Sequence, residues 1–242
     1  MKTVGIVGGL GPQSTIDYYR SIISLYRRKV ADGSYPSIII DSLDVDKALR
    51  LVSSNNLQQL AEYFAGSIRK LAAAGADFAL LSANTPHIVF NDVRRLSPLP
   101  LISIVEATCE EVVRRGLKTV SLLGTRFTMS GRFYPEICEK HGIALVPPSP
   151  EEQAYIHDKY VNELVNGVFL PETRDRLRQI IALQKQRDRI QGVILAGTEL
   201  PLLLRADSIE GLPILDTTQI HVNAAVSEML ENYLSNEAKS VI

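Results

Sequence analysis

Two short polar segments could carry chemistry, and each directly follows a run of apolar residues. They are Ser82-Ala-Asn-Thr-Pro-His87 and Gly197-Thr-Glu-Leu-Pro201. Their hydroxyl, amide, carboxylate and imidazole groups are types that bind a small polar ligand or move a proton. We predict that both segments lie at strand ends and direct these groups toward a ligand. The simpler alternative for the first segment is a strand–turn–helix junction, with Asn84 and Thr85 as caps and Pro86 as the first helical residue.

A glycine-rich loop, Gly8-Gly-Leu-Gly-Pro-Gln-Ser-Thr15, follows the first apolar run and opens a helical pattern. Glycines let the backbone approach a ligand, and a helix N-terminus offers free N–H groups to an anion. A dinucleotide site is disfavoured, because Ser14 stands where the fingerprint has its third glycine and no P-loop lysine follows. We therefore expect Gly9, Gly11 and Gln13 to contact a small carboxylate.

Other polar residues are weaker candidates for the same ligand. Thr125 and Thr128 lie in Leu123-Gly-Thr-Arg-Phe-Thr-Met129, the counterpart of the glycine loop in the second half of the chain. Their hydroxyl groups are possible donors to the ligand. Arg50 follows the strand-end segment Asp41-Ser-Leu-Asp44 and could meet a second carboxylate.

Three histidines are candidate bases. His87 ends the first polar segment. His157 lies with Lys159, a candidate substrate-binding residue, on a predicted helix, away from the apolar face that Ile156, Tyr160 and Leu164 form. His221 ends Asp216-Thr-Thr-Gln-Ile-His221, which combines an acid, two hydroxyls and an imidazole. A structural cap on the final helix is the alternative for that last segment.

The elements that position these residues occur twice in the chain. Three segments return in the same order and at nearly constant offset: Lys2–Gly9 as Lys118–Thr125, Ala76–Ala83 as Gln191–Gly197, and Leu99–Ser103 as Leu212–Asp216. Repeats of this length are duplicated domains rather than solenoid units. We predict one domain from residues 1–113 plus 216–242 and a second from residues 114–215.

Each half alternates apolar strands with amphipathic helices, which predicts an α/β fold with parallel sheets and right-handed crossovers. The predicted strands are Val4–Val7, Ile38–Ile40, Phe78–Leu81, Leu101–Ile104, 119–123, 143–146 and 192–196. The predicted helices start near Ser14 and cover Leu57–Ala74, 130–140, 153–166, 172–188 and 219–234, the last crossing back onto the first domain. Two flavodoxin-like domains related by a pseudo-twofold axis would form the active-site cleft between them, at the carboxyl ends of their strands.

Composition excludes several classes of function. The chain has 242 residues, 26 basic against 27 acidic, and no basic stripe for nucleic acid or membrane. No signal pattern or membrane-spanning apolar run is evident, so a cytoplasmic protein is expected. Cys109 and Cys138 are expected to be core residues without a disulfide, and no spacing suggests a metal site.

The chain resembles the aspartate/glutamate racemase family over nearly its whole length. The resemblance rests on five motifs in family order: Gly8-Gly-Leu-Gly-Pro, Asn84-Thr-x-His87, Leu123-Gly-Thr125, Thr198-Glu-Leu-Pro201 and Asp216-Thr-x-x-Ile-His221. It implies an amino-acid racemase, an isomerase that needs neither pyridoxal phosphate nor metal and acts on a small acidic amino acid or related acid. It also implies that Asn84, Thr85, Thr198 and Glu199 hold the substrate, and that the protein is a homodimer.

The chain departs from that family at two positions. The resemblance implies a thiol at each of positions 83 and 197, whereas this chain has Ala83 and Gly197. A thiol suits proton transfer near neutral pH, because its surroundings can lower its pKa. Three hypotheses remain: proton chemistry with another base (His157, His87, His221 or Glu199), such as a lyase or one-base isomerase; a true racemase; or a protein that binds a small acid without turning it over.

Overall fold

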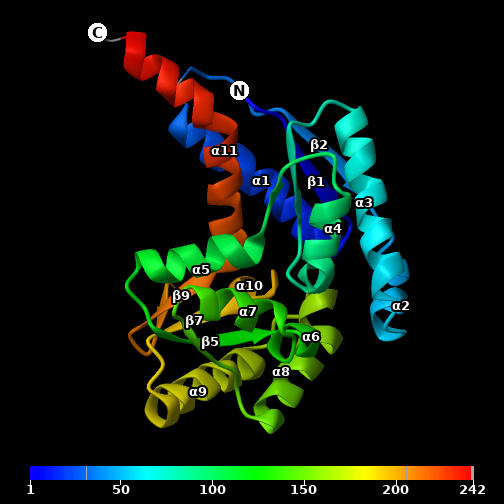
Figure 1. The fold of residues 1–242 in the computed structure, drawn as a ribbon. Helices are drawn as coiled ribbons and strands as arrows, with labels where there is room; N and C mark the ends of the chain where they lie inside the picture. The colour runs from blue at the N-terminus through cyan, green and yellow to red at the C-terminus, as the bar shows by residue number, and fades with distance from the viewer. Residues whose placement is uncertain (31, 205–206, 241–242) are drawn as a thin grey trace. The chain divides into compact units, whose positions relative to one another are not determined.

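The structure is a computed structural model that describes residues 1–30, 32–204 and 207–240. Its chain forms two compact α/β units, drawn in Figure 1. The first comprises Met1–Ser103 and His221–Ile242, and the second comprises Ile104–Ile220. Each is built on its own sheet, as the duplicated sequence predicts.

The first unit has a parallel four-stranded sheet in the order β2-β1-β3-β4. Its strands are β1 (Val4–Gly8), β2 (Ile38–Ser42), β3 (Phe78–Leu81) and β4 (Leu101–Ile102). Its helices are α1 (Pro12–Lys29), α2 (Val45–Ser53), α3 (Leu57–Ala73), the 3₁₀ helix η1 (Thr85–Val89), α4 (Phe90–Leu96) and, from His221 on, α11 (Thr217–Ser240).

The second unit has a five-stranded sheet in the order β6-β5-β7-β9-β8. Its strands are β5 (Thr119–Gly124), β6 (Ala144–Val146), β7 (Gly192–Ala196), β8 (Ser208–Ile209) and β9 (Leu212–Asp216). Its helices are α5 (Ile104–Arg114), α6 (Arg126–Met129), α7 (Phe133–Lys140), α8 (Pro150–Asn162), η2 (Leu164–Asn166), α9 (Pro171–Asp188) and α10 (Leu200–Leu204).

The two sheets share the strand order that a duplicated chain would have. Strands β1, β2, β3 and β4 have the same order and parallel sense as β5, β6, β7 and β9. The short strand β8 was not predicted; it pairs antiparallel with β9 and extends only the second sheet. The helix predicted over 153–166 lies earlier in the chain, because α8 begins at Pro150 and ends at Asn162, and a separate 3₁₀ turn follows.

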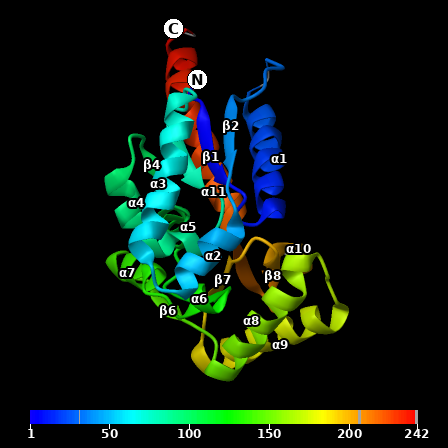
Figure 2. The same ribbon diagram turned by 90° about the vertical axis from the view of Figure 1, so that its right-hand side faces the viewer.

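Each sheet is covered on both faces by helices, so its central strands β1, β3, β5 and β7 are buried on both sides. In the first unit, α1 and α11 pack on one face through Tyr18 and Val226, and α3 packs on the other through Phe64. Figure 2 shows α1 and α3 on opposite sides of β1 and β2. The final helix, from Val222 on, thus packs within the first unit.

Helix α5 belongs to the second unit, because Ile104, Cys109 and Val112 pack with Val120 and Leu122 of β5. The chain therefore passes from the first unit to the second at residues 103–104, whereas we predicted 113–114. It returns to the first unit at residues 220–221, whereas we predicted 215–216.

The tight turn after β1 depends on Gly9, so a substitution at this position tests the turn geometry. Its φ of +76° favours glycine, and a β-carbon there would lie 2.6 Å from the Leu43 nitrogen and closer still to the Leu43 carbonyl. We expect Gly9→Ala to lower the free energy of unfolding by more than about 2 kcal/mol. Gly66→Ala is the matched control. Gly66 lies inside α3, and a β-carbon there would meet only an Arg69 side-chain nitrogen at 3.8 Å, so this substitution should stabilise the protein by roughly 0.5–1 kcal/mol. Urea denaturation measures both; equal effects would contradict the turn geometry.

Candidate functional site

In the first unit, hydrogen bonds tie the glycine loop to the end of β3. The Ser14 hydroxyl donates to the Ser82 carbonyl at 2.6 Å, and the Ser82 hydroxyl donates to the Val7 carbonyl at 3.1 Å. The Gly9 N–H donates to the Thr15 hydroxyl at 2.9 Å. The two segments that the sequence singled out in this half are therefore joined into one structure at the carboxyl end of the sheet.

The residues after β3 present both backbone and side-chain groups. Ala83 and Thr85 are half-buried and Asn84 is buried. Helix η1 begins at Thr85 with Pro86 in its first turn, but the Asn84 side chain makes no capping bond to it. The strand–turn–helix junction of the simpler alternative is thus present. Asn84 does not cap the helix, however, so capping does not account for an asparagine at this position.

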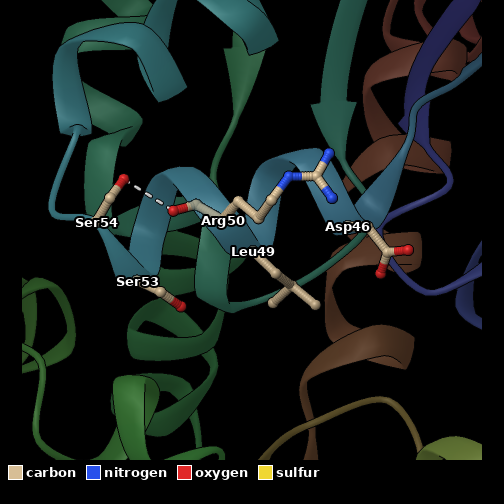
Figure 3. Close-up of a pocket in the computed structure, with 5 residues that line it drawn as sticks. All are labelled: Asp46, Leu49, Arg50, Ser53 and Ser54. Atoms are coloured by element: carbon tan, nitrogen blue, oxygen red, sulfur yellow. Dashed lines mark hydrogen bonds between the residues drawn. The ribbon is translucent and has the colours of Figure 1, made fainter.

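Gln13 and Arg50 are exposed, unlike the residues after β3. Gln13 lies in the first turn of α1, 3.5 Å from an Asp17 oxygen. Arg50 lies on α2 and faces Asp44 across 4.0 Å. The shallow hollow beside it is lined by one segment alone, Asp46, Leu49, Arg50, Ser53 and Ser54 (Figure 3). A hollow along a single helix face encloses no ligand, so the role predicted for Arg50 remains a prediction.

In the second unit, Thr125 and His157 organise the turn after β5. Thr125 is the N-cap of α6: its hydroxyl accepts from the Thr128 N–H at 3.3 Å and lies 3.2 Å from the Thr128 hydroxyl. His157 Nδ1 accepts the Arg126 N–H at 3.3 Å, which places the ring proton on Nε2. Partial burial, and then the Arg126 charge, lower the pKa of His157, so the ring is neutral at pH 7.

Glu199 is a buried carboxylate just beyond β7. The Thr198 hydroxyl donates to its Oε2 at 2.8 Å, and the Tyr160 hydroxyl of α8 donates to the same oxygen. Sequence reasoning placed Tyr160 on the apolar face of its helix and missed its polar contact. A buried tyrosine hydroxyl requires a partner, but the sequence does not indicate that the partner lies 39 residues away.

Lys159, a predicted substrate-binding residue, has a partner on its own helix. Its ammonium group pairs with Glu163, whose second oxygen accepts the Thr173 hydroxyl at 2.6 Å. This pair raises the pKa of Lys159. A ligand that used Lys159 would have to compete with Glu163.

His87 and His221 are buried in the first unit. The His221 Nε2–H donates to the Ile102 carbonyl at 3.0 Å, so Nδ1 accepts the Tyr18 hydroxyl at 2.8 Å. The His87 Nδ1–H donates to the Ala83 carbonyl at 3.1 Å, and its ring stacks on Phe90. Both nitrogens of His221 are occupied by structural bonds, which weakens its candidacy as a base.

The remaining residue predictions concern cysteines and Asp216. Cys109 and Cys138 are free and buried, as predicted for core residues. The Cys138 thiol and burial raise the pKa of Cys109, which keeps it protonated. Asp216 caps α11 by accepting the N–H groups of Thr218 and Gln219 at 2.9 and 3.1 Å, which is the structural alternative for that segment.

Among residues 1–30, 32–204 and 207–240, no group of three or more His, Cys, Asp or Glu residues could hold a metal ion. Within these same residues, no helix combines the length and the apolar character needed to cross a membrane.

Two α/β sheets, one parallel and one mostly parallel, with polar residues at their strand ends are typical of proteins that bind small ligands. Comparison with known proteins identifies the family. Residues 7–225 match the model of the Asp/Glu/hydantoin racemases, and the chain belongs to this family of isomerases.

Similar proteins cover almost all of the chain. A broad specificity amino-acid racemase of Bacillus subtilis (strain 168), RacX, is 26% identical over 94% of this chain and 98% of its own. The crystal structure of an aspartate racemase homologue from Pyrococcus horikoshii OT3 has a TM-score of 0.84 and 32% identity, over 95% and 99% of the two chains. Aspartate racemase from Picrophilus torridus shares the fold, with a TM-score of 0.72 and 21% identity over 96% and 94%.

The buried histidines predict how stability depends on pH. Burial, and then the nearby His221, lower the pKa of His87 to about 3, and burial lowers that of His221 to about 4. Above pH 6.5 both rings are neutral whether the chain is folded or not. As the pH falls below 6.5, the unfolded chain takes up protons that the folded chain refuses, so stability falls until the folded pKa values are reached.

Between pH 7.5 and 5, each buried histidine should lower the free energy of unfolding by about 2 kcal/mol. Urea denaturation at both pH values measures the loss. His221→Gln should remove about half of this pH-dependent loss, although it destabilises the protein at both pH values. His141→Gln, at an exposed position, is the control and should leave the loss unchanged. A loss that is the same in the His221 variant would contradict the assignment.

Proposed function

We propose that this chain is a cofactor-independent enzyme that moves the α-proton of a small acidic amino acid such as aspartate or glutamate. Membership of the Asp/Glu/hydantoin racemase family supports amino-acid racemase chemistry. Both RacX, named as a broad specificity racemase, and the Pyrococcus aspartate racemase homologue align over nearly their whole length. The substrate class comes from these relatives and from the motifs that resemble theirs.

One observation carries the proposal: the Glu199 carboxylate, buried beyond β7 and held by two hydroxyl donors. Burying a carboxylate is costly unless hydrogen bonds compensate it, and here Tyr160 and Thr198 both donate to Oε2. Such a group can accept a proton. Its place beyond the carboxyl end of a parallel strand is where ligands of α/β sheets bind.

We propose substrate-binding residues at the strand ends within each unit. In the first unit these are Gly9, Gly11, Asn84 and Thr85, which lie on the joined loop and strand end. In the second unit they are Thr125, Thr128 and Thr198, whose hydroxyls lie beyond β5 and β7. His157 is a second candidate base, since its neutral ring can accept a proton. We also propose that the protein is a cytoplasmic homodimer.

A second candidate function is a one-base isomerase or lyase, or a protein that only binds a small acid. Ala83 and Gly197, at the positions where the resemblance implies thiols, favour this alternative. Neither a methyl group nor a hydrogen atom can exchange a proton with substrate. Two-sided proton transfer, which racemisation requires, would then depend on other groups.

Deuterium exchange tests the proposal. The purified protein is incubated in D2O with L- and D-aspartate, L- and D-glutamate and related acids, and loss of the α-proton is followed by NMR. We expect exchange with at least one acidic amino acid, and a decrease of roughly 100-fold or more in Glu199→Gln, the usual contribution of a general base. Glu151→Gln, an exposed carboxylate on α8, is the matched control and should exchange at the unmodified rate.

The configuration of the product separates the candidates. Formation of the opposite enantiomer with deuterium at Cα indicates a racemase, and deuterium confined to the starting enantiomer, without inversion, indicates a one-base enzyme. Absence of exchange, together with a ligand-induced rise in melting temperature, would overturn the enzymatic proposal and leave a small-acid binding protein.

A further inference from the structure

The backbone at Gly197 has no room for a side chain. A β-carbon on this residue would lie 2.5 Å from Cε2, 2.9 Å from Oη and 3.0 Å from Cζ of Tyr160. Contacts this short do not occur in packed proteins, so either the tyrosine or the backbone would have to shift. The space that a side chain of residue 197 would enter is therefore already filled by the edge and hydroxyl of the Tyr160 ring.

Tyr160 is held firmly in that position. It is buried within the second-unit core cluster, which includes Ile156, Leu164 and Leu195. Its hydroxyl donates to Glu199 Oε2. Moving the ring away from residue 197 would therefore break a buried hydrogen bond to a carboxylate and disturb the packing of α8.

We propose that the Tyr160 hydroxyl, bonded to Glu199, is the proton-carrying group beyond β7 and takes the place that a side chain at residue 197 would otherwise have. The inference rests on the proposed function, and it adds a catalytic residue that the sequence motifs do not contain. Its basis is position: Oη is a polar, proton-bearing atom within 2.9 Å of where the missing β-carbon would be.

The proton transfer balances without a further reactant. The substrate Cα–H bond breaks, its electron pair remains on the substrate as the enolate of the α-carboxylate, and the proton forms a new O–H bond on Tyr160. The proton that Tyr160 held passes to the Glu199 carboxylate along the existing hydrogen bond. The reverse sequence returns a proton to Cα, and exchange of the Glu199 proton with solvent introduces deuterium.

Electrostatics supports a relay rather than a free phenolate. Burial, and then the Glu199 charge, raise the pKa of Tyr160 well above its usual value. The phenol therefore stays protonated near neutral pH. It can accept the substrate proton only while it gives its own proton away, and Glu199 is the acceptor in contact with it.

Removing the hydroxyl alone tests the catalytic part. Tyr160→Phe keeps the ring and its packing, and Tyr155→Phe makes the same change at a partly buried tyrosine of the same helix. In the D2O assay, we expect Tyr160→Phe to lower kcat roughly 100-fold or more with KM changed less than threefold, and Tyr155→Phe to match the unmodified protein.

The outcomes distinguish this inference from the proposed function. Exchange by Tyr160→Phe at the unmodified rate, while Glu199→Gln abolishes it, would overturn the role of Tyr160 and leave the function standing. Absence of exchange in the unmodified protein would overturn both. A loss confined to KM would also overturn the inference, because it would assign Tyr160 to substrate binding alone.

A thermodynamic cycle tests the steric part and needs no activity. Gly197→Ala should lower the melting temperature by at least about 4 °C in the unmodified background, since overpacking a filled core is costly. In a Tyr160→Ala background, the same change should shift it by less than about 1 °C, because the obstructing ring is gone. Equal shifts in the two backgrounds would show that Tyr160 does not occupy the place of a side chain at residue 197.

Discussion

The hydrogen bond from Tyr160 to Glu199 is the interaction on which the strand end of the second unit depends. It joins α8 to the segment after β7 and fixes the tyrosine ring against the backbone of Gly197. Three features follow from it. Residue 197 has to be glycine, the Glu199 carboxylate can be buried because its charge is compensated by donors, and α8 is held where His157 accepts the Arg126 N–H.

In the first unit, smaller groups make the hydrogen bonds at the equivalent strand end. At the end of β3, serine hydroxyls bond to backbone carbonyls, as Ser14 does to Ser82, and no aromatic ring takes part in these bonds. Ala83 is consequently left half-buried, whereas Gly197 at the equivalent place is buried beneath Tyr160. The duplicated sheets thus keep the same strand order but present different chemistry at corresponding strand ends: backbone and amide groups in one unit, and a phenol with a carboxylate in the other.

The sequence predicted the elements well, because buried parallel strands are apolar without alternation and Gly75 and Gly9 mark turns that need positive φ. It could not predict contacts between segments distant in the chain. Tyr160 has the helical spacing of a core residue, and the residues near it in the sequence do not indicate that Glu199 is its hydrogen-bond partner. The sequence shows that Lys159 is a basic residue. Only the structure shows that it pairs with Glu163, four residues later on the same helix, so that a ligand would compete with Glu163 for it. The two-residue strand β8 is too short for periodicity to detect.

A phenol places different requirements on its neighbouring groups than a thiol does. A thiol can ionise near neutral pH and act as a base alone. A buried phenol beside a carboxylate cannot, since both burial and the adjacent charge oppose its ionisation. Proton transfer through Tyr160 therefore requires Glu199 as the final acceptor, and the two residues function only as a pair. Thr198 and Tyr160 both donate to Oε2 of Glu199, and together they compensate its buried charge. In the proposed relay, the phenol keeps its proton until the substrate supplies another.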